Sequence, residues 1–192
     1  MASVTVFLEG KLRLKVNRAK SAVAPVGERQ FLGHRLNPYG SMGIAPKSLK
    51  RAKDRLRRIT RRNRGIALDK MVGEVNSFVT GWVTYYRHAQ CKTALHDLDG
   101  WLRRKLRCVR FKHCKRAKTI AGFLQGNGVP EWRAWLLALS GKGWWRMAGS
   151  PQACEAMTIA WFETLGLTSL ANHHARLNDV GNRRIREVCP VV

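Results

Sequence analysis

Acidic residues are scarce in this chain of 192 residues, where 12 Asp and Glu stand against 36 Lys and Arg. The formal net charge at pH 7 is therefore +24. Repulsion among so many like charges favours opening of the chain, and a bound polyanion relieves it. Nucleic acid is the first candidate for that polyanion, and an anionic membrane surface is the second. An enzyme for a small acidic substrate is a weaker interpretation, because one small anion needs only a few cations.

Long apolar runs are absent as well. No uncharged stretch approaches the roughly 20 residues that a transmembrane helix needs, so we expect no membrane partner. Residues 1–8 lack the basic start and the longer apolar stretch of a secretory signal. The cysteines number 5, so at least one is unpaired, and we expect a reducing cytoplasm. Hydrophobic residues still make up 45% of the chain, enough to build the core of one domain or two small ones.

Paired metal ligands are also missing. Cys108, His113 and Cys114 lie close together in the sequence. A structural zinc site normally uses two pairs of ligands, each pair about two to four residues apart. The two cysteines are too far apart for such a pair, and no second pair follows. We therefore predict no metal ion and no cofactor, and we expect buried or half-exposed thiols.

Positive charge is concentrated in two blocks. Residues 47–64 contain ten Lys or Arg and one acid, Asp54, whereas residues 101–118 contain nine and no acid. A run of charges is usually a solvated helix face, but this excess of cations favours contact with phosphates. Residues 119–175 differ, because they are nearly neutral and hold five of the seven tryptophans. The sequence thus divides into a basic middle and an aromatic-rich second half.

The first basic block predicts a helix that begins at Pro46 and continues to residue 64. Its apolar residues recur every three or four positions over residues 49–59, which gives one narrow stripe. Proline is tolerated at the first helical position, and Gly65 can end the helix. The remaining faces carry Lys and Arg, so we expect this helix to dock by its stripe and present cations elsewhere.

Two further helices are predicted over residues 68–87 and 93–111. The former has a wide apolar stripe, which is typical of a well-buried helix. In the latter, Thr93 is a plausible N-cap, and Asp97 and Asp99 lie near the positive end of the helix dipole. Three helices joined by short links predict a three-helix bundle.

The amino-terminal 45 residues show a different pattern. Residues 12–16 alternate between apolar and basic side chains, as a half-buried strand does. Residues 21–26 and 30–36 are further candidate strands, and residues 42–45 can return as a hairpin partner after a turn at residues 37–40. A sheet of so few short strands is only marginally stable by itself. This region therefore resembles the edge of a larger structure.

Several motifs resemble one protein family. Residues 12–21, followed by Phe31-Leu32-Gly33, resemble the last palm motifs of reverse transcriptases. Several later segments resemble, in their order and spacing, the thumb, or maturase domain, of bacterial group II intron proteins. These segments are residues 46–50, 61–65, 78–86, 98–107, 142–146, 150–151 and 160–162. The resemblance covers nearly the whole chain, and its specificity lies in the order of the motifs.

The resemblance implies a mainly α fold with a small β part. Residues 1–45 are expected to be a remnant of a reverse-transcriptase palm, and residues 46–118 a three-helix thumb or maturase bundle. Residues 119–192 are expected to form a helical, Trp-rich extension. In the family, the thumb binds the intron RNA and steadies its splicing-competent form, while the RNA is the catalyst. The implied partner is group II intron RNA, with target DNA and a separate amino-terminal reverse-transcriptase half as further candidates.

Binding to intron RNA requires cations for phosphates and aromatic or polar groups for unpaired bases. The arginines of the predicted third helix fall off its apolar stripe, and Tyr85 offers a ring next to the stripe of the second. The candidate RNA-binding residues are Lys47, Lys50, Arg51, Lys53, Arg57, Arg58, Arg61, Arg62, Arg64, Tyr85, Arg103, Arg104, Arg107, Arg110, Lys112, Lys142 and Arg146.

No catalytic residue is assigned. Reverse transcriptases of this kind carry an aromatic-Ala-Asp-Asp motif upstream of the segment that residues 12–17 resemble, because polymerisation uses two metal ions bridged by carboxylates. This chain has no Asp-Asp pair. Asp97 and Asp99 lie two positions apart on a predicted helix, so they point in different directions. We therefore expect an RNA-binding maturase module that lacks the polymerase site.

Three other interpretations remain open at this point. The chain can be part of a reverse transcriptase that acts only with a separate amino-terminal half. It can be a generic basic protein that binds RNA or DNA, or the product of a decayed gene.

The purified chain alone is expected to show no template-directed nucleotide incorporation with Mg²⁺ or Mn²⁺, because it has no carboxylate pair to bridge two metal ions. A primer-extension assay measures this directly. Incorporation above background that survives replacement of Asp97 and Asp99 would contradict the expectation.

Overall fold

The computed structural model describes residues 2–19, 21, 23, 25–28, 30–37 and 40–188. Over these ranges the protein is mainly helical, with one small antiparallel sheet near the amino end, as predicted. The elements in chain order are α1 (Ala2–Gly10), η1 (Val26–Glu28, a 3₁₀ helix), β1 (Gln30–Phe31), β2 (His34–Leu36), β3 (Met42–Ile44), α2 (Pro46–Ile59), α3 (Leu68–Tyr85), α4 (Lys92–Cys114), α5 (Ala117–Gln125), α6 (Glu131–Ala138), α7 (Trp144–Met147), α8 (Pro151–Ala156), α9 (Ile159–Thr164) and α10 (Leu170–Val188).

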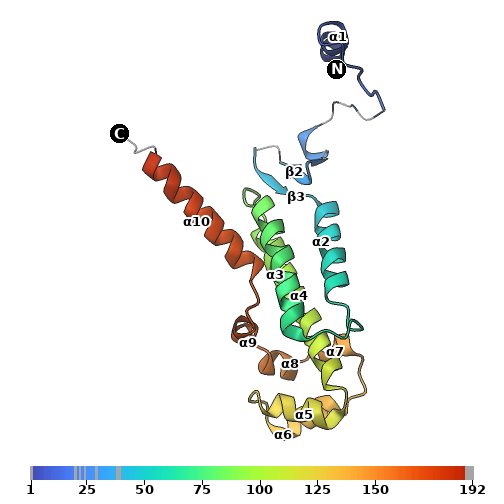
Figure 1. The fold of residues 1–192 in the computed structure, drawn as a ribbon, viewed down its shortest axis with the longest axis vertical. Helices are drawn as coiled ribbons and strands as arrows, with labels where there is room; N and C mark the ends of the chain where they lie inside the picture. The colour runs from blue at the N-terminus through green and yellow to red at the C-terminus, as the bar shows by residue number, and fades with distance from the viewer. Residues whose placement is uncertain are drawn as a thin grey trace.

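Helices α2, α3 and α4 form the predicted bundle at the centre of the molecule (Figure 1). Helix α2 buries its apolar stripe, with Ala52, Leu56 and Ile59 in the core, together with Ser48. Helix α4 buries a longer row of leucines, and α3 buries a broad valine-rich face. Removing this apolar surface from water is the main favourable contribution to folding, at about 25 cal/mol per Å². The wide stripe predicted for the second helix is therefore confirmed.

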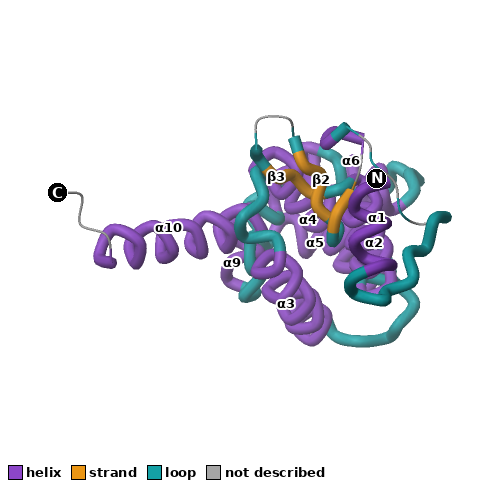
Figure 2. Tube along the Cα trace, turned by 90° about the horizontal axis from the view of Figure 1, so that it is seen from above, coloured by secondary structure: helices purple, strands orange, loops and turns teal. Residues whose placement is uncertain are grey.

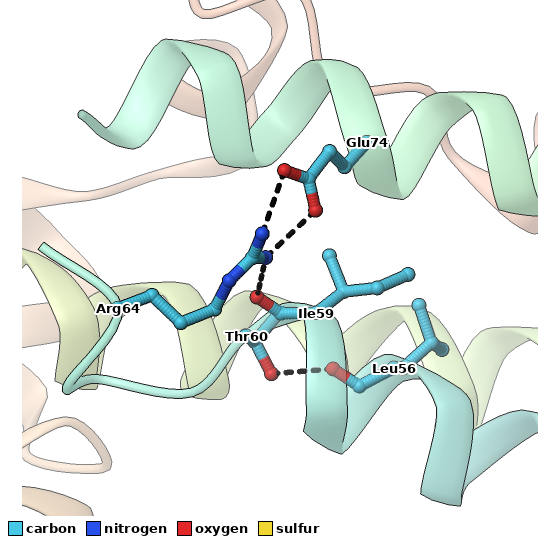
Figure 3. Close-up of polar contacts among 5 residues, drawn as sticks. All are labelled: Leu56, Ile59, Thr60, Arg64 and Glu74. Carbon is cyan, nitrogen blue, oxygen red and sulfur yellow. Dashed lines mark hydrogen bonds and ion pairs between the residues drawn. The ribbon is translucent and has the colours of Figure 1, made fainter. Parts of the chain in front are cut away.

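Helix α2 ends at Ile59, five residues before the predicted end at Arg64. The backbone N–H and the hydroxyl of Thr60 both donate to the carbonyl of Leu56, at 2.8 and 2.7 Å. The Arg64 side chain donates to the carbonyl of Ile59 at 2.8 Å (Figure 3). These bonds satisfy carbonyls that a helix end leaves without partners, so the chain leaves the helix there. Gly65, with φ +66°, belongs to the loop that follows.

The predicted N-cap at Thr93 is also wrong. Helix α4 begins at Lys92, its cap position is Cys91, and no side chain caps it. Asp99 is 3% exposed and serves another helix. Its carboxylate accepts hydrogen bonds from the Ser169 hydroxyl at 2.8 Å and from the backbone N–H groups of Leu170 and Ala171 at 2.9 and 3.1 Å. A carboxylate of α4 therefore caps the positive end of α10.

The amino-terminal strands are partly as predicted. No strand forms over residues 12–16, which follow the unpredicted helix α1, and Leu12 and Leu14 stay exposed. Nor do residues 21, 23, 25 and 26 form a strand; residues 22 and 24 lie outside the described residues. The alternation of residues 12–16 finds no neighbouring strand to pair with, so its apolar side chains gain nothing from an extended conformation.

The predicted strand over residues 30–36 is a hairpin, because β1 and β2 are joined by a turn at Leu32 and Gly33. Both turn residues have positive φ, +48° and +79°, as a two-residue turn of this hand requires. The prediction that residues 42–45 pair in a hairpin is confirmed, since β3 pairs antiparallel with β2. In the intervening turn, the N–H of Gly40 donates to the carbonyl of Asn37; Pro38 and Tyr39 lie outside the described residues.

Gly33 fixes the sheet on the bundle. Its carbonyl accepts hydrogen bonds from the Ser48 hydroxyl at 3.1 Å and the Ala45 N–H at 3.0 Å, next to the start of α2. A Cβ at this position would lie 2.5 Å from the hydroxyl of Tyr86, so only glycine fits. The glycine of the Phe31-Leu32-Gly33 motif thus has a packing reason in addition to its turn conformation.

The second half of the chain continues the core of the bundle. Helices α5 and α6 lie at the end opposite the sheet (Figure 1), and Met157, Phe162 and Leu170 are buried in the same cluster as α2–α4. Helix α10 packs against α3 and α4 near its start and then extends away from the rest of the molecule (Figure 2). Each of the predicted units 46–118 and 119–192 therefore contributes to one core.

Replacing Asp99 by Ala is expected to lower the free energy of unfolding by about 1–3 kcal/mol, because it leaves buried donors at the start of α10 without an acceptor. Urea denaturation measures the change. Asp97→Ala is the matched control, since Asp97 is exposed on the same helix, and it is expected to change stability by less than about 0.5 kcal/mol. Equal effects of the two changes would contradict the capping role of Asp99.

Candidate nucleic-acid interface

The cations of α2 form a surface that is almost free of negative charge. Five of its candidate residues are exposed, and one, Lys53, is half-buried. The exposed ones are Lys47, Lys50, Arg51, Arg57 and Arg58. Arg57 pairs with Asp54, one turn away, but both side chains are about half exposed, so water and salt weaken the pair. The narrow apolar stripe predicted this arrangement correctly.

Arg64 has a different role from the other candidates. Its guanidinium forms a forked pair with the Glu74 carboxylate of α3, at 2.7 and 2.8 Å (Figure 3). The hydrogen bond from Arg64 lowers the pKa of Glu74, and the same bond raises the pKa of Arg64. Because Arg64 also holds the carbonyl of Ile59, it fastens the loop after α2 to α3. Arg61 and Arg62, in the same loop, are exposed.

The α4 arginines are turned largely toward the protein itself. Arg104 donates to the carbonyl of Trp145 at 3.0 and 2.9 Å, and its guanidinium lies 4.3 Å from the centre of the Trp145 ring. Arg107 donates to the carbonyl of Met157 at 2.8 and 3.3 Å, over the ring of Phe162. Burial lowers the pKa of Arg107. Both guanidinium groups therefore join α4 to the second half of the chain.

Arg110 repeats the pattern one step further along α4. Its guanidinium lies 4.4 Å from the centre of the Phe123 ring in α5. The Nε atom is buried and has no hydrogen-bond partner among the described residues. Arg104, Arg107 and Arg110 share one helix face, because residues three apart are neighbours on a helix. Of the predicted α4 set, Arg103 and Lys112 make no hydrogen bond or ion pair with any residue that the structure describes.

Tyr85 is 55% exposed but already has contacts within the protein. Its hydroxyl donates to the carbonyl of Leu32 at 2.8 Å, and its ring stacks on His34 with centres 5.6 Å apart. Tyr86, its neighbour, is 5% exposed, as expected for adjacent residues that face apart on a helix. A base can reach only the part of the Tyr85 ring that His34 leaves open.

Lys142 and Arg146 are exposed, but the structure does not bring them onto the α2 surface. They line a separate pocket together with Leu136 of α6. Trp144 is half-buried and Trp145 is 41% exposed, because adjacent residues on a helix face apart.

Lys105 is a residue that the sequence analysis missed. It lies between α2 and α7, with its ammonium group 5.7 Å from the Trp101 ring centre and 5.5 Å from that of Trp145. Burial lowers its pKa, and the positive charges of Arg57 and Arg62 lower it further. The sequence signal was the position of Lys105 one helical turn after Trp101. It becomes informative only when the distant Trp145 is placed beside it.

Three of the four described cysteines are buried. Cys91 Sγ lies 3.7 Å from His174 Nε2, but burial raises the pKa of this thiol to about 11, so it stays protonated near neutral pH. Burial also raises the pKa of Cys108 and Cys114. Within the described ranges, no three His, Cys, Asp or Glu residues lie close enough together to hold a metal ion. None of the described helices has both the length and the apolar character needed to cross a membrane.

The cationic surface coincides with a known domain. Residues 49–125 match the family model of the group II intron, maturase-specific domain. This part of the chain is similar to a group II intron maturase-specific domain. The match runs from the first turn of α2 through α3 and α4 to the end of α5, and it confirms the resemblance to the maturase domain for these residues. The comparison with curated proteins gave no match.

Within the maturase-specific domain, Arg107→Gln is expected to lower the free energy of unfolding by about 1–3 kcal/mol, because the carbonyl of Met157 loses a charged donor. Chemical denaturation followed by tryptophan fluorescence measures the loss. Arg103→Gln removes the same charge from the same helix without a described partner, and it serves as the control. A destabilisation by Arg103→Gln equal to that by Arg107→Gln would show that charge alone, and not this contact, is responsible.

Proposed function

We propose that this protein binds structured RNA of a group II intron and assists its splicing, without a polymerase active site of its own. The observation that carries the proposal is the place of the cations. Apart from Lys47, the α2 surface and the loop after it lie within the matched residues 49–125, and Asp54 is the sole acid between residues 47 and 64.

The physical argument rests on phosphate neutralisation. Each RNA phosphate that meets a Lys or Arg releases condensed counterions, which favours binding at low salt. The exposed cations of α2 lie outside the narrow apolar stripe by which the helix packs, so they can follow a phosphate backbone. The charge of Glu74 on α3 is offset by its forked pair with Arg64.

The chemical step of splicing belongs to the RNA in this proposal. The protein contributes charge neutralisation, which lets negatively charged segments of a folded RNA approach one another. Phosphate contacts carry little sequence information, so preference for one intron must come from RNA shape and from unpaired bases. The chain has no Asp-Asp pair that could bind catalytic metal ions for DNA synthesis.

A second candidate function is a reverse-transcriptase part that acts with a separate amino-terminal half. It is supported by the exposed apolar side chains near the sheet, where Phe31 and Leu32 are 65% and 68% exposed. Strand β1 pairs on one side only, so its free edge can accept a further strand. Target DNA is a further candidate partner, since it offers the same phosphates. The described cysteines are all free, which suits action in the reducing cytoplasm.

Replacing Lys47, Lys50, Arg51 and Arg58 together by Gln is expected to weaken binding to a folded RNA and to flatten its salt dependence. Each lost phosphate contact lowers the slope of log K against log salt by up to about 0.9, so four lower it by up to about 3.6. Glutamine keeps the helix propensity of α2. Fluorescence anisotropy with a labelled intron RNA over a range of salt concentrations measures the slope.

The matched control replaces Lys70, Lys92, Arg116 and Lys118 by Gln. These four residues are exposed, and their replacement removes the same charge from positions outside the α2 surface. If both sets of variants change the slope equally, net charge and not the α2 surface determines binding. If the unchanged protein does not bind folded RNA at low salt, the proposed function is wrong.

A further inference from the structure

A cationic pocket lies where the loop after α2 meets α4 and α7. We call it the loop pocket; its volume is about 330 Å³, and its lining includes Arg57, Arg61, Arg62, Lys105 and Trp145. No acidic residue lines it. The pocket draws on segments that are distant in the sequence, so neither basic block alone indicates it.

Three cations of the loop pocket have no hydrogen-bond or ion-pair partner among the described residues, whereas Arg57 pairs with Asp54. The side chains of Arg61, Arg62 and Lys105 make no hydrogen bond or ion pair with any residue that the structure describes. Lys105 is nevertheless half-buried, next to the positive charges of Arg57 and Arg62. Like charges gathered in a partly desolvated pocket repel one another, and an anion with several oxygens relieves this repulsion.

An aromatic ring completes the loop pocket. Trp145 keeps 41% of its surface exposed while Arg104 covers its ring at 4.3 Å and holds its carbonyl. The ring is thus fixed in place before any ligand arrives, which lowers the entropic cost of binding. An aromatic ring beside unpaired cations is the arrangement that binds an unpaired nucleotide, because the ring contacts the base and the cations hold the phosphate.

We propose that the loop pocket binds one unpaired nucleotide of an RNA strand, with its phosphate among Arg61, Arg62 and Lys105 and its base against Trp145. This inference rests on the proposed function and specifies one contact within it. A regular duplex does not fit, because its bases are stacked inside the helix and cannot reach the ring.

A second cationic pocket adjoins the loop pocket, so a bound RNA strand can extend into it. It shares Arg62 and Asn63 with the loop pocket and is lined further by Lys112, His113 and Lys115, again without an acid. The two pockets therefore adjoin at the loop after α2, which Arg64 fastens to α3. A phosphate next to the bound nucleotide meets Lys112, a predicted RNA-binding residue with no partner among the described residues.

The test compares two RNA probes with variants of the full chain. The probes are a labelled single strand of about ten nucleotides, within the range that such sites cover, and a labelled duplex of the same sequence. The pocket variant is Arg62→Gln with Lys105→Gln, and the ring variants are Trp145→Leu and Trp145→Phe. The control is Lys70→Gln with Lys118→Gln, which removes equal charge from exposed positions outside both pockets.

The pocket variant is expected to bind the single strand about tenfold more weakly than the control, with a salt slope smaller by about 0.7 for the one lost phosphate. Trp145→Leu is expected to lower affinity for the single strand by about fivefold or more, and Trp145→Phe to retain most of it. Duplex binding is expected to be the same for Trp145→Leu and the unchanged protein. Thermal unfolding identifies any variant that fails to fold. If Trp145→Leu does not fold, the binding of the single strand by the Arg62→Gln, Lys105→Gln variant tests the proposal.

Three other outcomes would contradict, in turn, the proposed function, the loop pocket and the assignment of its ligand. If the unchanged protein binds neither probe nor a folded RNA, the proposed function fails and the inference with it. If the protein binds RNA and the pocket variant equals the control, only the loop pocket is wrong. If inorganic phosphate, at matched ionic strength, displaces the strand from the unchanged protein but not from the pocket variant, the pocket takes free phosphate and the assignment to a nucleotide is wrong.

Discussion

The burial of α4 is the constraint on which the rest of this structure depends. Its row of leucines must leave water, yet the same helix carries a series of arginines whose charge resists burial. The protein resolves the conflict by giving those guanidinium groups ring faces and backbone carbonyls from the second half of the chain. The second half of the chain therefore covers α4, and its aromatic rings contact the guanidinium groups of that helix.

Identical residue types consequently serve opposite purposes on neighbouring helices. On α2 the cations face water and repel one another, which keeps that surface ready for a polyanion. On α4, Arg104, Arg107 and Arg110 instead contact the second half of the chain, whereas Arg103 and Lys112 have no hydrogen-bond or ion-pair partner among the described residues. Arg64 combines both roles. It pairs with Glu74 inside the protein, and this pair holds the loop that carries the exposed Arg61 and Arg62. A count of positive charges thus overstates the surface that is free to bind.

Periodicity in the sequence predicted the three central helices, because their apolar stripes are local patterns. The end of α2 could not be predicted, since it depends on which carbonyls of α2 accept from the side chains of Thr60 and Arg64. The inward turn of the α4 arginines was equally hidden, as their acceptors lie 41 and 50 residues further along the chain. Lys105 was missed for the same reason. In the amino-terminal part, strand propensity without a neighbouring strand predicted too much sheet.

The capping of α10 by Asp99 has a consequence for biosynthesis. The hydroxyl that this carboxylate accepts from lies 70 residues later in the chain, so it is still inside the ribosome or not yet made when α4 first emerges. Until then the charge has to stay hydrated, because burying it without a donor is costly. The face of α4 that α10 covers therefore stays open during translation. The three donors to Asp99 are complete only after Ala171 has left the ribosome, so the capping of α10 has to follow the synthesis of α4.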